Sequence, residues 1–282
     1  MKIALLGSAG MLAARVVRRL EEEGYAVQAV QCRKRAGRGA RNGSPNGQMA
    51  RVEGALRGAR VLVHLAWADP ALERSPLPLG DCLAPLGYFL SAAAAHRRIE
   101  RVVVVSPASL YGEGSYTCPV NGTVTPQWRR IEDLQAHRWE HHCPVCGEQL
   151  LPEPTAESHP PAPLSAAAAL VYAQERLATA WALERRIPAV ALRYFQMYGG
   201  ETGDAAGSLV ARAIEGLPVE VPEDGGQTRD YVHLDDVVNA VSLALRASCR
   251  DLLVLNVGTG VATSAREFLH CLGRALGRPV RT

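Results

Sequence analysis

Short apolar runs alternate along the chain with segments in which apolar residues recur every three or four positions. The first run, KIALL at 2–6, leads through a glycine turn into a segment with apolar Leu12, Val16 and Leu20 at helical spacing. Further apolar runs at 61–65 (VLVHL, with His64 as its one polar residue) and 102–105 (VVVV) are typical of buried strands. The opening strand, turn and helix predict the first half of a dinucleotide-binding unit.

The glycine turn contains Gly7 and Gly10 in the order Gly-Ser-Ala-Gly. The first glycine permits the tight turn, the second lets a pyrophosphate approach the backbone, and the helix N-terminus attracts its charge. A single glycine motif is also compatible with a packing turn in another kind of α/β domain.

The second predicted strand, 25–31, does not end in the acidic residue that would hold an adenosine ribose. It runs into Cys-Arg-Lys-Arg at 32–35, and the chain has no Asp or Glu between Glu23 and Glu53. Arg33 in this basic tip could accept a 2′-phosphate, which would favour NADP; a solvated basic turn fits equally well. Residues 36–50 are rich in Gly, Asn, Ser and Arg, and we expect a mobile loop there in place of a third strand.

Several motifs occur in an order that resembles the extended short-chain dehydrogenase/reductases, the NAD(P)-dependent epimerase/dehydratase family acting on nucleotide sugars. They are SPASLYG at 106–112, YAQER at 172–176, LRYFQMYG at 192–199 and GQTRDYVHLDD at 226–236. The resemblance implies an α/β fold: a Rossmann-like doubly wound parallel sheet with a small C-terminal substrate lobe and ligands at the carboxyl ends of the strands.

On this basis four regions are expected. Residues 1–114 would form the first part of the Rossmann core, and 115–164 a cysteine-containing insert. Residues 165–199 would carry the catalytic helix and the following strand. The last region, 200–282, would be the substrate lobe, interleaved with the last core strand.

The resemblance assigns the acid/base role to Tyr172. The family's lysine, four residues later and so on the same helical face, is replaced by Arg176, whose planar fork is a poor substitute for an ammonium over the cofactor ribose. The family's Ser or Thr that orients the substrate oxygen falls on Pro107, which has no donor. Ser106 or Ser109 could take over that role.

Substrate-facing positions resemble the family more closely. Arg229 matches an arginine that contacts the substrate diphosphate, a task suited to guanidinium, although a structural ion pair with Asp230 or Asp235 is the alternative. Gln196 stands where relatives often carry a substrate-binding Asn. Tyr111 is expected to line the pocket, with a core tyrosine as the alternative.

Positions implied to face the cofactor differ from the family at several points, including Gly200 in place of a proline. NAD or NADP would be held by Gly7, Gly10, Arg33 and Ala66, and the binding is expected to be either weak or lost.

The insert contains Cys118-Pro-Val-Asn121 and, after several histidines, Cys143-Pro-Val-Cys146-Gly. A C-P-x-C-G knuckle points two thiolates at one metal, and a second knuckle normally completes a tetrahedral zinc site. Cys118, Cys143, Cys146 and a histidine, His141 or His137, could bind structural zinc. A vestigial knuckle with free thiols is equally compatible with the sequence.

Composition and charge exclude some classes of binding partner. The 282 residues carry a net charge of +3, without the basic stripe that nucleic acid binding needs, and no apolar run reaches the roughly 18 residues of a membrane span. We therefore expect a cytoplasmic protein with a small-molecule substrate and neither nucleic acid nor membrane as partner. The family resemblance further implies a homodimer, formed through helices near 166–186 and 80–97.

Three functions are compatible with these residues. In the first, Tyr172 transfers protons in a dehydration, epimerisation or cyclising addition with no net redox change, in deoxysugar or secondary-metabolite biosynthesis. In the second, the chain is an NAD(P)-dependent nucleotide-sugar 4-epimerase or reductase that tolerates Arg176. In the third, it is a catalytically dead binding protein.

Overall fold

The computed structural model describes residues 1–7, 10–31, 45–66, 79–96, 98–199 and 205–282. Its centre is a six-stranded, all-parallel sheet with the strand order β11-β8-β4-β3-β1-β2. These strands are β1 (Lys2–Gly7), β2 (Ala26–Gln31), β3 (Val61–Leu65), β4 (Arg101–Pro107), β8 (Ala189–Tyr194) and β11 (Leu252–Val257). The predicted doubly wound α/β fold is confirmed.

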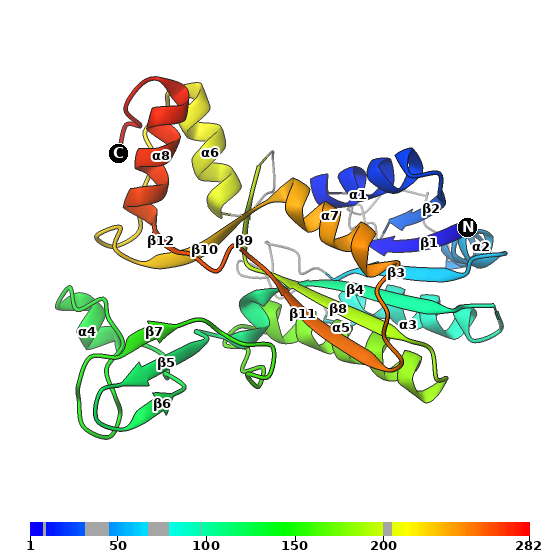
Figure 1. Ribbon diagram of the computed structural model, residues 1–282, viewed down its shortest axis with the longest axis horizontal. Helices are drawn as coiled ribbons and strands as arrows, with labels where there is room; N and C mark the ends of the chain where they lie inside the picture. The colour runs from blue at the N-terminus through cyan, green and yellow to red at the C-terminus, as the bar shows by residue number, and fades with distance from the viewer. Residues whose placement is uncertain (8–9, 32–44, 67–78, 97, 200–204) are drawn as a thin grey trace.

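Helices cover both faces of the sheet (Figure 1). One face carries α1 (Met11–Glu22) and α7 (Leu234–Ala244); the other carries α2 (Pro45–Leu56), α3 (Leu79–Ala93) and α5 (Ala166–Glu184). Successive strand residues alternate between the two cores, so that Ile3 and Leu5 pack on the α1 and α7 side and Ala4 and Leu6 on the other. Burial on both faces explains why these strands are uninterrupted apolar runs.

The chain from β2 to β3 differs from the expected loop. The loop predicted over 36–50 is wrong for its last part, because α2 begins at Pro45; residues 36–44 lie outside the described part of the chain. Within the described residues β2 is an edge strand of the sheet.

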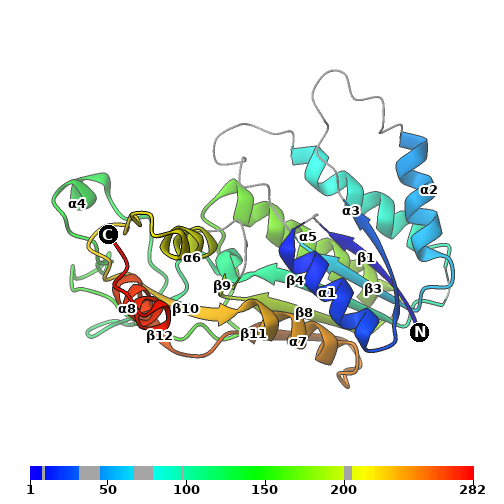
Figure 2. The same ribbon diagram turned by 90° about the horizontal axis from the view of Figure 1, so that it is seen from above.

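Two smaller units lie beyond the carboxyl ends of the parallel strands (Figures 1 and 2). The C-terminal lobe combines a three-stranded sheet, β12-β10-β9, with two helices. Its elements are β9 (Gln196–Tyr198), α6 (Ala205–Glu215), β10 (Thr228–His233), β12 (Ala262–Ser264) and α8 (Ala265–Leu276).

The insert forms the other unit, with a three-stranded antiparallel sheet in the order β6-β5-β7. It follows a 3₁₀ turn, η2 (Ala108–Tyr111), and comprises β5 (Ser115–Cys118), β6 (Gly122–Val124), α4 (Ile131–Gln135) and β7 (Leu151–Glu153). None of the helices in the described ranges has the length and apolarity needed to cross a lipid bilayer.

Candidate active site

The glycine turn lies where the strand order of the sheet reverses. From β1 the chain moves outward to β2 and then back to β3 on the other side of β1, and ligands of such sheets bind at this switch point. Gly7 packs so closely on the neighbouring strand that a Cβ there would lie 3.0 Å from Leu65 Cβ. Gly10 caps α1 in an extended conformation, with no side-chain cap on the first amides of the helix.

Of the two other predicted cofactor residues, the structure describes Ala66 but not Arg33. Ala66 is buried directly after β3, and its amide donates to the carbonyl of Val105 over 2.8 Å. Arg33 lies outside the described residues, so the choice between NADP recognition and a solvated turn stays open.

Helix α5 carries Tyr172 and Arg176. It begins at the Ser165 cap, whose side chain accepts from the amide of Ala168 over 3.1 Å. Tyr172 is half-buried and Arg176 is exposed. Within the ranges that the structure describes, the Tyr172 phenol has no hydrogen-bond partner, so it is free to meet a ligand.

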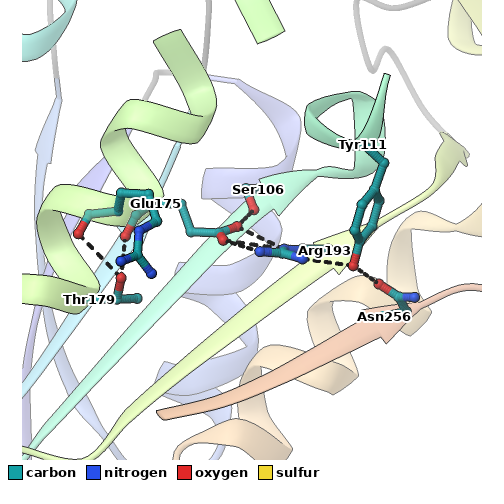
Figure 3. Close-up of polar contacts among 7 residues, drawn as sticks. Ser106, Tyr111, Glu175, Thr179, Arg193 and Asn256 are labelled. Carbon is teal, nitrogen blue, oxygen red and sulfur yellow. Dashed lines mark hydrogen bonds and ion pairs between the residues drawn. The ribbon is translucent and has the colours of Figure 1, made fainter. Parts of the chain in front are cut away.

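The side of α5 that faces the sheet holds a buried ion pair (Figure 3). Glu175 and Arg193 are 2% and 5% exposed, and Arg193 Nη2 lies 2.6 Å from Glu175 Oε1. Ser106 also donates its hydroxyl to Glu175 Oε2 over 2.5 Å. A buried carboxylate is tolerated only when it is paired and hydrogen-bonded, and here it is both.

The same arginine extends the network to a second phenol (Figure 3). Arg193 Nη1 donates to the Tyr111 hydroxyl over 2.8 Å, and that hydroxyl donates to Asn256 Oδ1 over 2.9 Å. Asn256 in turn donates from Nδ2 to the carbonyl of Thr155 over 2.7 Å. Burial raises the pKa of Tyr111, and the hydrogen bond from Arg193 opposes this rise.

These contacts correct two predictions. Ser106 is fully buried and its proton is committed to Glu175, so its hydroxyl does not replace the one missing at Pro107. Ser109 is the member of the pair that reaches the surface. Tyr111 is 2% exposed and belongs to the core, so the alternative interpretation as a core tyrosine holds in place of a pocket wall.

A second buried polar contact ties α5 to the sheet. His64 Nε2 lies 3.1 Å from Gln174 Oε1, and His64 Nδ1 lies 3.3 Å from the carbonyl of Leu6. Burial lowers the pKa of His64 to about 4. His64 is therefore neutral at pH 7 and acts as a link between strands and helix.

The predicted substrate residues Arg229 and Gln196 lie in the lobe sheet, Arg229 exposed on β10 and Gln196 half-buried on β9. The alternative of an Arg229–Asp230 ion pair is not what the described residues show. Asp230 instead accepts from the amides of Thr259 and Gly260, over 2.8 and 2.7 Å.

Charged side chains of the insert and of the residues just before it interact with Arg229. Glu113 Oε2 lies 3.4 Å from His141 Nε2, and this contact, with the positive charges of Arg229 and Arg129, lowers the pKa of Glu113. Arg129 also bridges the insert to the lobe, with Nη2 2.7 Å from Glu223 Oε1. The insert and the lobe thus share one charged boundary.

The cysteines of the insert converge as predicted, but without His141. The sulfur atoms of Cys118, Cys143 and Cys146 all lie within 4.8 Å of one another, and this group does not include His141, which pairs with Glu113. The expectation of His141 as the fourth ligand is therefore corrected. The backbone amides of Cys146 and Val145 lower the pKa of Cys143 to about 6.

A cavity of about 740 Å³ opens elsewhere, between α8 and the segment 221–224 of the lobe. Arg266 and Arg278 line it, but both already donate to backbone carbonyls, of Asp224 and of Ala213 and Ile214. Neither Tyr172 nor Arg229 is among its lining residues.

Comparison with known proteins finds a similar family. Residues 143–258 match the model of the NAD dependent epimerase/dehydratase family. Over this segment the chain is similar to that family. Among the solved structures of similar fold is MoeE5 in complex with UDP-glucuronic acid and NAD, with a TM-score of 0.72 and 26% identity, covering 100% of this chain and 85% of that one.

Two similar proteins are named as nucleotide-sugar epimerases. The dTDP-L-rhamnose 4-epimerase of Burkholderia thailandensis is 31% identical over 189 residues, which is 64% of this chain and 50% of the relative. A putative UDP-glucose 4-epimerase of Methanocaldococcus jannaschii is 29% identical over 130 residues, 44% of this chain and 41% of the relative. The matched part thus spans half or less of these relatives' length.

Sequence reasoning missed Glu175 and Asn256. Neither stands out from its neighbours in the sequence. Glu175 lies inside the YAQER motif, between Tyr172 and Arg176, and Asn256 is the penultimate residue of the apolar strand β11. The one available signal was periodicity, because Val171, Glu175 and Ala178 follow the buried face of α5, where an acidic residue needs a partner.

Proposed function

We propose that this chain is an epimerase or dehydratase of nucleotide-linked sugars in which Tyr172 is the general acid and base. The observation that carries the proposal is the contrast between two phenols. Tyr111 is held between Arg193 and Asn256, whereas Tyr172, one helical turn before Arg176, is half-buried and has no hydrogen bond within the described part of the chain. A proton-transferring group must be within reach of its substrate, and of these two phenols Tyr172 is the one not already bonded there.

The surroundings of Tyr172 favour proton transfer with no net redox change. Arg176 brings positive charge to the helix surface but not the compact ammonium of a lysine. Pro107 offers no hydroxyl, and the neighbouring Ser106 is bound to Glu175. A positioned acid/base typically contributes about 10²- to 10⁴-fold to rate, which suits elimination or epimerisation beside a carbonyl.

We also propose that NAD binds at the switch point of the sheet. The pyrophosphate end fits, because the first amides of α1, directly after Gly10, have no side-chain cap and can donate to an anion. When bound, NAD would supply hydride acceptance and return. The nicotinamide end fits less well, since Arg176 and Pro107 replace the lysine and hydroxyl that the family pattern implies.

A second candidate is an NAD-dependent nucleotide-sugar 4-epimerase with hydride transfer. The comparisons favour it, because several of the similar structures are UDP-sugar 4-epimerases in complex with NAD. Deoxysugar nucleotides are the first substrates to test for both candidates, since the dTDP-L-rhamnose 4-epimerase is 31% identical over its matched part.

One experiment separates the candidates. The purified protein is incubated in D₂O with a panel of dTDP- and UDP-sugars that includes 4-keto sugars, whose carbonyl makes the neighbouring C–H acidic, and products are analysed by mass spectrometry. Deuterium gained from solvent at a carbon atom, and lost in Tyr172→Phe, supports proton transfer by Tyr172. A product without solvent deuterium, together with a primary isotope effect for substrate deuterated at C4, supports hydride transfer. No product with any sugar, but a thermal shift with one, supports a binding protein.

A homodimer is proposed on the outer faces of α3 and α5, which contact each other. Tyr88 on α3 is 57% exposed, and Leu177 on α5 is 48% exposed. Burying these side chains between two copies would remove apolar surface from water. Native mass spectrometry of the wild type and of Leu177→Glu tests this, with a shift to monomer expected only in the variant.

A further inference from the structure

The insert has too small an apolar core to hold its own fold. Its three strands have four, three and three residues, and its buried cluster consists of Cys118, Cys143 and Leu150, with Tyr116 and Val124 packed against it. Small sheets of this kind need a staple such as a disulfide or a metal. Two of the three buried residues are cysteines, which suggests that sulfur chemistry supplies the staple.

The two loops that carry the cysteines have the same form. Cys118-Pro-Val-Asn121 repeats the spacing and the central Pro-Val of Cys143-Pro-Val-Cys146, with an amide in place of the last thiol. The second loop makes a tight turn in which the Gly147 amide donates to the Cys143 carbonyl over 2.9 Å. Cys118 and Cys146 face each other with sulfurs 3.4 Å apart, too far for a bond and close enough to share an ion.

The side-chain amide of Asn121 lies against all three sulfurs and donates toward each of them. Its Nδ2 lies 3.6 Å from Cys118 Sγ, 3.4 Å from Cys143 Sγ and 3.1 Å from Cys146 Sγ. A tetrahedral zinc with bonds of about 2.3 Å to sulfur and 2.1 Å to oxygen would have edges of about 3.8 Å between sulfurs and about 3.6 Å from sulfur to oxygen. The amide group therefore occupies the position of the fourth ligand.

The amide can present oxygen at that position. The nitrogen and oxygen of a carboxamide have nearly the same size, and rotating the group by half a turn exchanges them. Oδ1 would then face the three thiolates and the ion between them. His141, the ligand that the sequence favoured, is held by Glu113 instead.

We propose that Cys118, Cys143, Cys146 and Asn121 bind a structural zinc ion, with Asn121 Oδ1 as the fourth ligand. The three thiolates neutralise the ion and leave a net charge of −1, and the amide replaces the fourth thiolate of a four-cysteine site. The ion fastens β5 to the loop at 143–146, and so holds the insert in the position from which Arg129 reaches Glu223 of the lobe.

The test measures metal content of the full chain by native mass spectrometry and its affinity by competition with a chromophoric chelator. We expect one zinc per wild-type chain and none in Cys146→Ser. Asn121→Ala should bind zinc at least about tenfold more weakly, because water must take over the vacated position. His141→Ala is the matched control and should keep wild-type affinity.

Asn121→Cys tests the same site by adding a fourth thiolate ligand. With Co²⁺ in place of zinc, its sulfur-to-metal charge-transfer absorption should exceed that of the wild type by about one third, since a fourth thiolate joins three. Proteolysis of the segment 115–153, with and without chelator, shows whether each variant keeps a folded insert.

Three results would overturn the proposal. One is a wild-type chain that takes up no zinc from excess Zn²⁺ under reducing conditions. Another is a Cys118–Cys146 disulfide as the stable form in the presence of zinc. The third is loss of zinc in His141→Ala, with Asn121→Ala unaffected.

Discussion

The central sheet and the insert are held together in different ways. The sheet buries apolar side chains on both faces, with Ile3 and Val103 in one core and Ala4 and Val104 in the other, all at 0% exposure. The apolar cluster of the insert has only three buried residues, two of them cysteines. Apolar burial contributes about 25 cal/mol per Å², so a core as small as that of the insert cannot offset the entropy of ordering its chain.

The difference shows where each region is vulnerable. In the sheet, the few buried polar residues are the sensitive positions, because a buried polar group destabilises the fold unless all of its hydrogen bonds are made. In the insert, the sensitive positions are the converging cysteines, because the small apolar cluster contributes little to the stability of the insert. Three predictions would break or sharpen this comparison.

The largest expected effect comes from breaking the buried ion pair. Glu175→Ala leaves Arg193 charged, buried and without its carboxylate, which should lower the free energy of unfolding by about 3–5 kcal/mol. Chemical denaturation monitored by circular dichroism measures it. Arg60→Gln is the control, because the Arg60–Glu100 pair is exposed and worth less than about 1 kcal/mol. Equal effects of the two substitutions would contradict this account of the network.

The next effect compares equal truncations in the two regions. Leu62→Ala in the sheet should lower the free energy of global unfolding by about 2–5 kcal/mol, because it opens a cavity in a tightly packed core. Leu150→Ala, equally buried in the insert, should leave the main transition nearly unchanged and accelerate proteolysis within 115–153. A main transition lowered equally by both would show that insert and sheet unfold together.

The last effect is a dependence of the free energy of unfolding on pH, caused by the buried His64 of the sheet. The pKa of His64 is about 4 in the fold, against an ordinary value of about 6.5, because burial disfavours the charged ring. The unfolded chain therefore binds the proton first, and stability should fall by about 3 kcal/mol in total as pH drops from 6.5 to 4. His64→Gln should flatten this dependence, whereas His270→Gln, at an exposed position, should not. An unchanged pH profile in His64→Gln would contradict it.

Much of the fold could be predicted from the sequence because its signals are local. The runs at 3–6, 61–65 and 102–105 are apolar except for His64, as expected for parallel strands covered on both faces. The start of α2 at Pro45 was missed because the residues around it are Gly, Asn and Ser, which favour loops. Helix formation there depends on the tertiary packing of Val52, Ala55 and Leu56.

The candidate site was less predictable, because the hydrogen-bond partners of its residues come from segments distant in the sequence. The cysteine motif fixed which thiols could converge, but whether His141 or Asn121 completes the group depends on Glu113, which lies outside the motif. Ser106 and Tyr111 carry the right groups for a site, yet Glu175 and Arg193 from distant segments bind them in the core. Only the folded arrangement separates a free hydroxyl from a committed one.

The central claim is that Tyr172 transfers the proton. The direct measurement is turnover of a dTDP- or UDP-sugar by wild type, Tyr172→Phe and Tyr25→Phe, each checked for an unchanged melting temperature. Tyr25→Phe removes the same hydroxyl just before β2, the edge strand of the sheet, away from α5. Tyr172→Phe should lose at least about 100-fold in rate, while Tyr25→Phe should keep wild-type activity. A fully active Tyr172→Phe would contradict this claim.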